Sequence, residues 1–346
     1  MTPRKQLDET LTAWAATDPL KDAVAATILC LADAAAKISR LLAAGPLAGD
    51  LGAVLSSGEA GEEQKALDVQ ADAIFLSCLR PAPVAAIASE EAEHAVLLDP
   101  AAPLLVALDP LDGSSNIETG LSVGSIFSIL PRCTSAAIEH EFLRPGTAQL
   151  AAGYVLYGPH TALVLSVGEG TDLYVLEPES RVFLLAQAGL KIPAGKAEFA
   201  INMSNYRHWD EGIRLYIDDC LSGQDGPRKI DFNMRWLACL VAEAHRIFSR
   251  GGIYLYPADA RKGYGSGRLR LIYEASPIAM LVQNAGGLAT DGATPILEKI
   301  PAKLHQRTPL VFGAHAKVER LASYLRTQGG PGEHAPLFRR RTLFSA

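Results

Sequence analysis

The chain has 346 residues, of which 49% are hydrophobic and 20% charged, and its formal net charge is −6. This is the composition of a folded globular protein and not of a disordered chain. The acidic balance, without a long basic segment, argues against a nucleic-acid partner. Because the sequence shows no recognisable signal peptide and no apolar segment long enough to span a bilayer, we expect a cytoplasmic protein with no membrane partner.

In the first half of the chain, apolar residues at three- and four-residue spacing predict helices at 19–44 and 64–79. Between these helices, residues 56–63 are rich in Ser, Gly and Glu, which favours a mobile loop. Residues 104–129 contain two apolar runs around an acidic, glycine-rich turn, which predicts a buried strand, a loop and a second buried strand. Shorter strands, the last three forming an antiparallel meander, are predicted at 84–88, 154–156, 161–167 and 173–176.

The second half of the chain alternates predicted strands and helices. Residues 184–196 contain several Gly and Pro and are expected to be irregular, so we place the boundary between an N-terminal lobe, 1–190, and a C-terminal lobe, 191–346, in this segment. The predicted elements that follow are strands at 198–202 and 253–256, an apolar run at 268–274, and helices at 211–221, 236–246 and 276–284. This alternation favours an α/β (α+β) sandwich with mixed sheets.

Two carboxylates, Asp109 and Asp112, stand at the end of the first buried strand and are followed at once by Gly113, Ser114 and Ser115. Carboxylates gather hard divalent cations such as Mg²⁺, and a Gly-Ser turn that opens a helix offers backbone N–H groups to a phosphate. The alternative is an ordinary surface turn, in which Asp-Pro and Asp-Gly are common. Two carboxylates within four residues, between a strand and Gly-Ser-Ser, favour the metal and phosphate site.

Further carboxylates follow other apolar runs. Ser89, Glu90 and Glu91 follow the short predicted strand at 84–88, and Glu274 closes an apolar run in the way that Asp109 closes its strand. Taken singly, each of them is also compatible with a solvated acid or, for Glu274, with an acid at a helix start. If the ends of these segments converge, their carboxylates can share metal ions.

A shared metal site would give these residues one chemistry, the hydrolysis of a phosphate ester. Two or more Mg²⁺ ions bound by the carboxylates would neutralise the phosphoryl oxygens and lower the pKa of a bound water. Glu91 or Asp68 would accept the proton of that water. The sequence has no G-x-x-x-x-G-K-[ST] loop, G-x-S-x-G elbow or H-E-x-x-H motif, which disfavours nucleotide-driven transfer and serine hydrolysis. Five cysteines without a C-x-x-C pair argue against a disulfide framework and a zinc ribbon.

Several motifs together resemble the class I fructose-1,6-bisphosphatases, within the wider superfamily of lithium-sensitive, magnesium-dependent sugar phosphatases. These motifs are S-E-E at 89–91, D-P-L-D-G-S-S-N-I at 109–117, S-V-G-S-I-F at 122–127, G-G-I-Y-L-Y-P-A at 251–258 and R-L-R-L-I-Y-E at 268–274. The D-P-L-D-G-S core marks the superfamily, whereas its extension and the segments S-V-G-S-I-F, G-G-I-Y-L-Y-P-A and R-L-R-L-I-Y-E are specific to the fructose bisphosphatase branch.

The resemblance implies a layered α-β-α-β-α sandwich, the sugar phosphatase fold, and a homotetramer. It also implies that a metal-activated water hydrolyses the 1-phosphate of fructose-1,6-bisphosphate to give fructose 6-phosphate. Sedoheptulose-1,7-bisphosphate is a candidate second substrate, so the enzyme would belong to gluconeogenesis or the Calvin cycle. Two or more Mg²⁺ ions per subunit are implied as cofactors, with Mn²⁺ as a substitute.

The resemblance further assigns roles to individual positions of this sequence. The metal shell would consist of Glu90, Asp109, Asp112, Glu274 and the carbonyl of Leu111. The catalytic acids would be Glu91 and Asp68, which handle the proton of the water, and Glu62 on a mobile loop. The 1-phosphate would be bound by the backbone of Gly113, Ser114 and Ser115. The sugar 6-phosphate would be bound by Asn202, Tyr256 and Arg268, with Arg235 reaching in from a neighbouring subunit.

Three positions depart from the best-known eukaryotic pattern. That pattern has Lys where this chain has Arg268, and it has Tyr where this chain has Asn205 and Trp236. Arg binds a phosphate with a broader donor fork than Lys, so Arg268 keeps its role while the sugar selectivity stays open. Two alternatives are another phosphatase of the superfamily, acting on an inositol phosphate or a nucleotide, and a non-catalytic sugar-phosphate sensor or assembly subunit on the same fold. The basic residues of the second lobe argue against the former, and the complete set of metal carboxylates argues against the latter.

Overall fold

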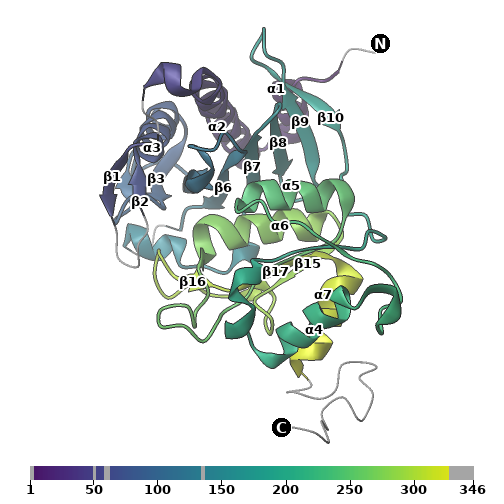
Figure 1. Ribbon diagram of the computed structural model, residues 1–346. Coiled ribbons are helices and arrows are strands. Elements are labelled where there is room, and N and C mark those ends of the chain that lie inside the picture. The colour runs from purple at the N-terminus through teal and green to yellow at the C-terminus, as the bar shows by residue number, and fades with distance from the viewer. Residues whose placement is uncertain (1–3, 50–51, 58–62, 134–136, 327–346) are drawn as a thin grey trace, which may run out of the picture.

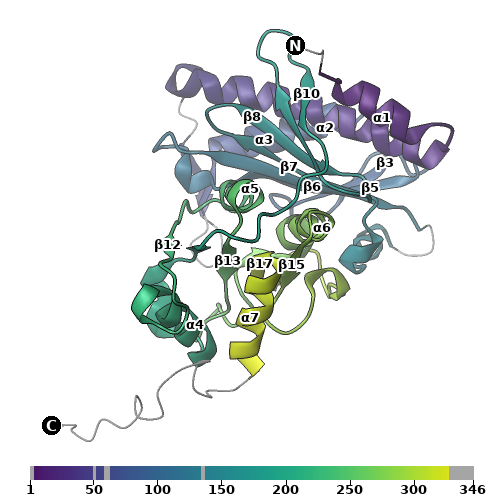
Figure 2. The same ribbon diagram turned by 90° about the vertical axis from the view of Figure 1, so that its right-hand side faces the viewer.

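The computed structural model describes residues 4–49, 52–57, 63–133 and 137–326 (Figure 1). Its elements form five layers in which helices alternate with two sheets, as Figure 2 shows from top to bottom. The layered sandwich of helices and mixed sheets that the sequence predicts is therefore confirmed.

Three helices, α1 (Leu7–Ala15), α2 (Pro19–Ala44) and α3 (Ala66–Leu79), form the outer layer against the larger sheet (Figure 2). α2 has the predicted bounds because the Asp18 carboxylate accepts hydrogen bonds from the first backbone amides of the helix and Gly45 turns the chain after its end. α3 begins at Ala66, slightly later than predicted, where the Asp68 carboxylate accepts a hydrogen bond from the Lys65 amide.

A short antiparallel hairpin of β1 (Val54–Ser57) and β2 (Glu63–Lys65) precedes α3. This hairpin occupies both ends of the segment in which a mobile loop is predicted. Residues 58–62, the rest of that predicted loop, lie outside the described residues.

The larger sheet has eight strands in the order β10-β9-β8-β7-β6-β5-β3-β4. They are β3 (Val84–Ser89), β4 (Val96–Leu97), β5 (Leu104–Asp112), β6 (Val123–Pro131), β7 (Ala151–Tyr157), β8 (Thr161–Ser166), β9 (Asp172–Leu176) and β10 (Phe183–Gln187). β3 and β5 are parallel and the other neighbours are antiparallel, so the predicted meander is confirmed. The irregular segment predicted from residue 184 is wrong at its start, because β10 pairs with β9 before the first of its Gly and Pro residues is reached.

Two helices, α5 (Leu240–Arg250) and α6 (Ser276–Asn284), lie between the two sheets (Figure 2). α6 has its predicted bounds, but α5 begins four residues later than predicted from 236. The delay has a local cause, because Ala238 adopts a left-handed backbone conformation (φ 56°) and Cys239 is extended, so neither can belong to the helix.

The smaller sheet has the order β12-β11-β13-β17-β15 and is also mixed. Its strands are β11 (Glu198–Ala200), β12 (Asn233–Met234), β13 (Ile253–Tyr256), β15 (Gly287–Thr290) and β17 (Leu310–Ala314). β11 is parallel to both β12 and β13, whereas β17 is antiparallel to β13 and β15. The helices α4 (Glu211–Leu221) and α7 (His315–Arg326) cover its outer face, and a separate short pair joins β14 (Leu269–Arg270) to β16 (Arg307–Thr308).

Apolar cores hold adjacent layers together. Ile28 and Phe75 belong to the core between the outer helices and the larger sheet, Leu281 and Phe312 to the core around α5 and α6, and Phe199 to the core beneath α4 and α7. Each of these side chains is at most 1% exposed, and burying such a side chain contributes about 1.5–3 kcal/mol. The layers are therefore fixed relative to one another by packing.

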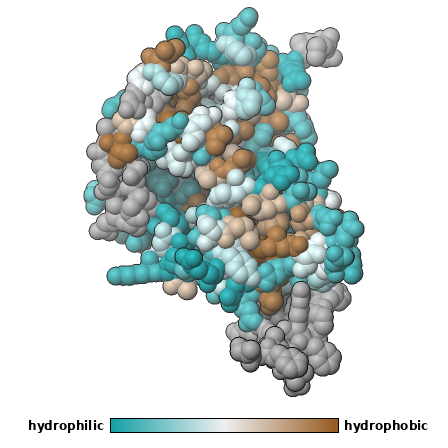
Figure 3. All heavy atoms as spheres, in the orientation of Figure 1, coloured by the Kyte–Doolittle hydropathy of each residue, from teal (hydrophilic) through white to brown (hydrophobic). Residues whose placement is uncertain are grey.

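The outer surface has no comparable apolar layer on the face that Figure 3 shows, where apolar residues are scattered among hydrophilic ones. Scattered apolar side chains of this kind are normal for a protein surface. Among the helices of the described residues, none combines the length with the apolar character that crossing a membrane requires.

One close contact sets the position of α5 on the larger sheet. A Cβ atom at Gly124 of β6 would lie 2.4 Å from the Cβ of Val241 in the first turn of α5. Real Cβ atoms do not approach so closely, so the missing side chain lets the helix sit directly on the strand. Gly124 pairs with Asp112 of β5, and the contact therefore brings the start of α5 next to that carboxylate.

We expect Gly124→Ala to destabilise the protein by about 1–3 kcal/mol, because the added methyl group overpacks the β6–α5 interface. Urea denaturation measures this change as a lower midpoint. Gly195→Ala is the matched control, since its Cβ would meet nothing within 4 Å, and it should leave the midpoint unchanged. Adding Val241→Ala to Gly124→Ala should restore part of the loss, and an unchanged midpoint in Gly124→Ala alone would contradict the contact.

Candidate active site

A bulge at the end of β5 separates the two acids of the central turn. Asp109 pairs with Ile126 of β6 and Asp112 pairs with Gly124, so three steps along β5 oppose two along β6. The extra residue is held by two hydrogen bonds: the Ser125 hydroxyl donates to the Pro110 carbonyl (2.7 Å), and the Leu111 amide donates to Asp109 Oδ1 (3.1 Å). A bulge re-aims the side chains around it, and here the two carboxylates have different surroundings.

The first carboxylate, Asp109, lies in a cluster with Glu90 and Glu274. One ligand atom from each of the three lies within 4.8 Å of the others. Glu90 directly follows β3, and its amide donates to the Leu108 carbonyl of the parallel neighbour β5 (2.9 Å). Two of the three acids therefore come from adjacent parallel strands, whose carboxyl ends lie at the same edge of the sheet.

The third acid, Glu274, is not at a strand end as the apolar run at 268–274 suggests. It lies in a π-helical turn, Leu271–Ala275, that continues directly into α6. All five residues of this turn are buried, so Leu271–Ala275 has no exposed face whose polar spacing would distinguish a helix from a strand. Single π turns inside helices frequently occur at functional sites.

The cluster has strongly perturbed acidity. Burial raises the pKa of Asp109 well above its usual range, and the charges of Glu90 and Glu274 raise it further. The pKa of Glu274 is raised by burial and by Glu90, and its backbone hydrogen bond from Arg270 opposes this. The Arg270 guanidinium also donates to Glu90 (3.2 Å). Three converging carboxylates in a buried place, with oxygen donors throughout, fit a hard divalent cation, which would relieve their repulsion.

The second carboxylate of the turn, Asp112, faces the start of α5. It accepts hydrogen bonds from the backbone amides of Leu240 (3.2 Å) and Val241 (2.7 Å) and from the thiol of Cys239 (2.9 Å). Gly113 (φ 82°) permits this approach, because a Cβ there would lie 2.7 Å from the Cβ of Cys239. This role of Cys239 could not be predicted, since cysteine is not among the usual residues before a helix.

Two further acids, Asp68 and Glu91, lie within electrostatic range of each other. Burial raises the pKa of Asp68 to about 7, and the charge of Glu91 contributes to the rise. One oxygen of Asp68 accepts a hydrogen bond from the Lys65 amide (2.8 Å), and the other is buried with no hydrogen-bond partner among the described residues. Glu62, the third predicted catalytic acid, lies outside the described residues.

The predicted loop after Asp112 contains a single 3-10 turn, Ser114–Asn116, and lies between the two predicted strands, β5 and β6. Its own hydrogen bonds use the amides of Asn116 and Ile117, which donate to the carbonyls of Gly113 and Ser114. The role of the Gly113, Ser114 and Ser115 amides in binding a phosphate stays a prediction.

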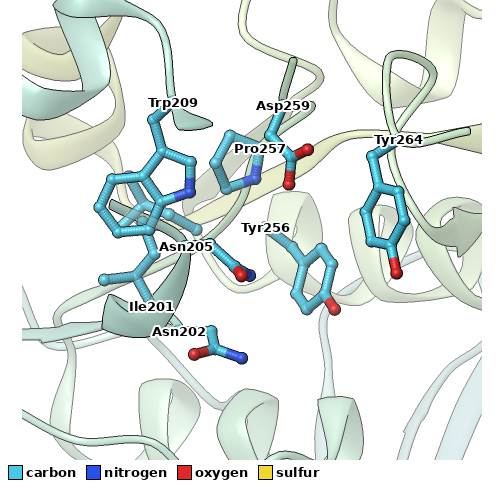
Figure 4. Close-up of a pocket in the computed structure, with 9 residues that line it drawn as sticks. Ile201, Asn202, Asn205, Trp209, Tyr256, Pro257, Asp259 and Tyr264 are labelled. Carbon is cyan, nitrogen blue, oxygen red and sulfur yellow. The ribbon is translucent and has the colours of Figure 1, made fainter. Parts of the chain in front are cut away.

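A pocket lies at the carboxyl ends of the parallel strands β11 and β13 (Figure 4). Ligands of open α/β sheets commonly bind at such ends. Of the positions that the sequence singles out, Asn202, Asn205 and Tyr256 line this pocket. The full lining is Ile201, Asn202, Asn205, Trp209, Leu255, Tyr256, Pro257, Asp259 and Tyr264.

The remaining predicted positions lie around this pocket or apart from it. Arg268 donates a hydrogen bond to the hydroxyl of Tyr264, a lining residue (2.8 Å). Trp236 stacks on Tyr254, with ring centroids 6.1 Å apart. Arg235 is exposed, and its guanidinium donates to the adjacent Met234 carbonyl (2.9 Å).

Tyr256 links the pocket to the acidic cluster. Burial raises the pKa of its phenol, the charge of Arg268 lowers it and the charge of Glu274 raises it. The phenol is therefore within electrostatic range of both Arg268 and Glu274.

Comparison with known proteins gives matches along most of the chain. Residues 8–188 match the family model described as the N-terminal domain of fructose-1-6-bisphosphatase, and residues 192–326 match its C-terminal domain. The chain is 55% identical to the protein named fructose-1,6-bisphosphatase class 1 1 of Xanthobacter autotrophicus, over 96% of this chain and 90% of that protein. It is 54% identical to fructose-1,6-bisphosphatase class 1 of Sinorhizobium medicae, over 95% of both chains.

A solved structure is similar as well. The crystal structure of Leishmania major fructose-1,6-bisphosphatase in holo form matches with a TM-score of 0.86 at 30% sequence identity, over 94% of this chain and 99% of that one. All three comparisons indicate the same family. Two family models together span most of the chain, the two relatives are more than 50% identical, and the solved structure has the same fold. The chain belongs to the class 1 fructose-1,6-bisphosphatase family.

Proposed function

We propose that this protein is a phosphoric monoester hydrolase that converts fructose-1,6-bisphosphate to fructose 6-phosphate and inorganic phosphate. The observation that carries the proposal is the cluster of Glu90, Asp109 and Glu274, together with an aromatic pocket whose lining residue Tyr256 lies within electrostatic range of Glu274. The names of its relatives support the same substrate. We place the activity in the cytoplasm and propose sedoheptulose-1,7-bisphosphate as a second substrate to be tested.

We propose Mg²⁺ as the cofactor, with two or more ions per subunit. Glu90, Asp109 and Glu274 would hold it, and Asp112 and the Leu111 carbonyl would complete the shell. The preference for Mg²⁺ follows from the ligand set, which consists of carboxylate and carbonyl oxygens and contains no thiolate or imidazole. When bound, such ions neutralise phosphoryl oxygens and favour the ionised form of a water nucleophile.

The residues of the chain have separate tasks in this proposal. Asp68, with a pKa of about 7, is suited to accept a proton near neutral pH, and Glu91 and Glu62 would assist it. The backbone of Gly113, Ser114 and Ser115 would hold the phosphate that is cleaved. The distal phosphate would be bound by Asn202, Tyr256, Arg268 and, from a second subunit of a homotetramer, Arg235.

The direct test is phosphate release from fructose-1,6-bisphosphate and from sedoheptulose-1,7-bisphosphate, each with Mg²⁺ and after chelation. We expect Mg²⁺-dependent release from the first. If neither bisphosphate releases phosphate in the presence of Mg²⁺ or of Mn²⁺, the non-catalytic sensor would be favoured.

We expect Asp109→Asn to lower kcat by about 100-fold or more, because a metal ligand is lost. A second readout is stability. Without metal, the variant should unfold at a higher temperature than the wild type, because the carboxylate that burial and repulsion destabilise is replaced by a neutral amide. With Mg²⁺ at 100 times its Kd, the free energy of unfolding of the wild type should rise by about 2.7 kcal/mol. That of the variant should rise much less.

The matched control for this experiment is Asp225→Asn, which removes an exposed carboxylate outside the cluster. It should keep both the activity and the stabilisation by Mg²⁺. A wild-type response to Mg²⁺ in Asp109→Asn would exclude Asp109 from the metal shell.

Asp68→Asn should lower kcat by about 10²-fold or more, because the proton acceptor is removed. The raised pKa of Asp68 also predicts a stability effect. The unfolded chain loses this proton near pH 4 and the folded chain near pH 7, so the stability that Asp68 contributes falls as the pH rises between these values. In thermal denaturation without metal, the unfolding temperature of the variant should therefore rise relative to that of the wild type between pH 4 and pH 8. A constant difference across this range would show that the carboxyl is not perturbed.

A further inference from the structure

The loop between β13 and β14 carries polar side chains whose role is not explained by the motifs. Its backbone is folded on itself around Tyr264. The Tyr264 amide donates to the Arg261 carbonyl (3.0 Å), and the amides of Asp259 and Gly267 donate to the Tyr264 carbonyl (3.3 and 3.0 Å). These bonds hold Tyr264 at the edge of the pocket, which it lines together with Asp259.

Asp259 and Arg261 form an ion pair inside this loop. Arg261 Nε lies 3.0 and 3.1 Å from the two carboxylate oxygens of Asp259, and the Arg261 amide also donates to one of them (3.0 Å). The Asp259 side chain in this pair is 4% exposed, so the pair is better shielded from water than an ordinary surface pair. The paired guanidinium lies against Tyr264, with its central carbon 4.1 Å from the ring centroid.

Tyr264 in turn contacts Arg268. Arg268 Nη1 donates to the Tyr264 hydroxyl (2.8 Å), and the central carbon of the guanidinium lies 4.8 Å from the ring centroid. Both contacts are favourable, one as a hydrogen bond from a charged donor and the other as a cation–π interaction. In Figure 4 the hydroxyl groups of Tyr264 and Tyr256 both point away from Asp259. The contacts thus run from Asp259 through Arg261 and Tyr264 to Arg268.

Fixing this guanidinium matters for phosphate binding. A long side chain such as Arg loses rotamer freedom when a ligand immobilises it, and this loss weakens binding. An Arg whose orientation is set beforehand loses less. Because a guanidinium has five N–H donors, Arg268 can keep its bond to Tyr264 while other donors bind a phosphate.

We propose that Tyr264, held in place by the Asp259–Arg261 pair, is a positioning residue. It orients Arg268 toward the distal phosphate of the substrate, which is the phosphate that is not cleaved. This inference rests on the proposed function, which supplies that phosphate. It gives the loop after β13 a role in substrate affinity and specificity, separate from the bond-breaking step at the acidic cluster.

The test begins with Tyr264→Phe, which keeps the ring and removes the hydroxyl. KM for fructose-1,6-bisphosphate should rise about 3- to 10-fold, while kcat falls much less. Fructose 6-phosphate carries the distal phosphate alone, and its Kd, measured by calorimetry, should rise by a similar factor. Tyr264→Leu should raise both constants further, because the cation–π contacts are lost as well.

A double variant separates positioning from direct contact with the substrate. If Tyr264 acts through Arg268, adding Tyr264→Phe to Arg268→Gln should raise KM no further. The matched control is Tyr324→Phe, which removes a hydroxyl bonded to Asp219 (2.6 Å) in the layer of α4 and α7. It can lower stability, but KM should stay at the wild-type value.

The outcomes distinguish this inference from the proposed function. No phosphate release by the wild type would overturn the proposed function and this inference with it. Normal activity of the wild type with unchanged KM and Kd in Tyr264→Phe would overturn the inference alone. A rise in KM that persists in the Arg268→Gln background would show that Tyr264 meets the substrate directly. Should Tyr264→Phe fail to fold, Asp259→Asn tests the same contacts from their other end and should raise KM in the same direction.

Discussion

The carboxylates of Glu90, Asp109 and Glu274 are held within 4.8 Å of one another, where burial and mutual repulsion raise the pKa of Asp109 and Glu274. Such an arrangement opposes folding unless packing elsewhere imposes it. Packing does so here, because Asp109 lies in β5, Glu90 directly follows the parallel neighbour β3, and Glu274 is fixed by a buried turn beside α6. A cation bound by the cluster would turn this repulsion into attraction, so metal binding there would stabilise the fold.

The extra residue in β5 places the two acids of the central turn in different surroundings. The bulge in β5 sends Asp109 to the cluster and Asp112 to the amides at the start of α5. That helix in turn reaches its position because Gly124 has no side chain. The central layer of helices thus contacts the larger sheet at residues next to the proposed metal site, and a small shift of α5 would move the carboxylate of Asp112.

Local patterns in the sequence were sufficient for much of the fold. The bounds of α2, α4 and α6 follow from apolar spacing and turn residues, and the meander of the larger sheet follows from short alternating runs. The start of α5 could not be predicted, because it depends on a left-handed Ala238, a conformation uncommon for alanine. Acids after apolar runs indicated Glu90, Asp109 and Glu274, although Glu274 lies in a helical turn. Cys239 and Tyr264 gave no signal, because their importance lies in contacts that no periodic pattern encodes.

The π turn that carries Glu274 has a consequence for how this protein can change in evolution. A π turn is equivalent to a helix with one inserted residue, and each residue of a regular helix rotates the next by about 100°. Losing one residue from Leu271–Ala275 would allow a continuous α-helix into α6 and would turn Glu274 away from Glu90 and Asp109. A single-codon deletion would therefore leave the layered sandwich largely intact while dispersing the acidic cluster. The same fold would then be open to a binding role without catalysis.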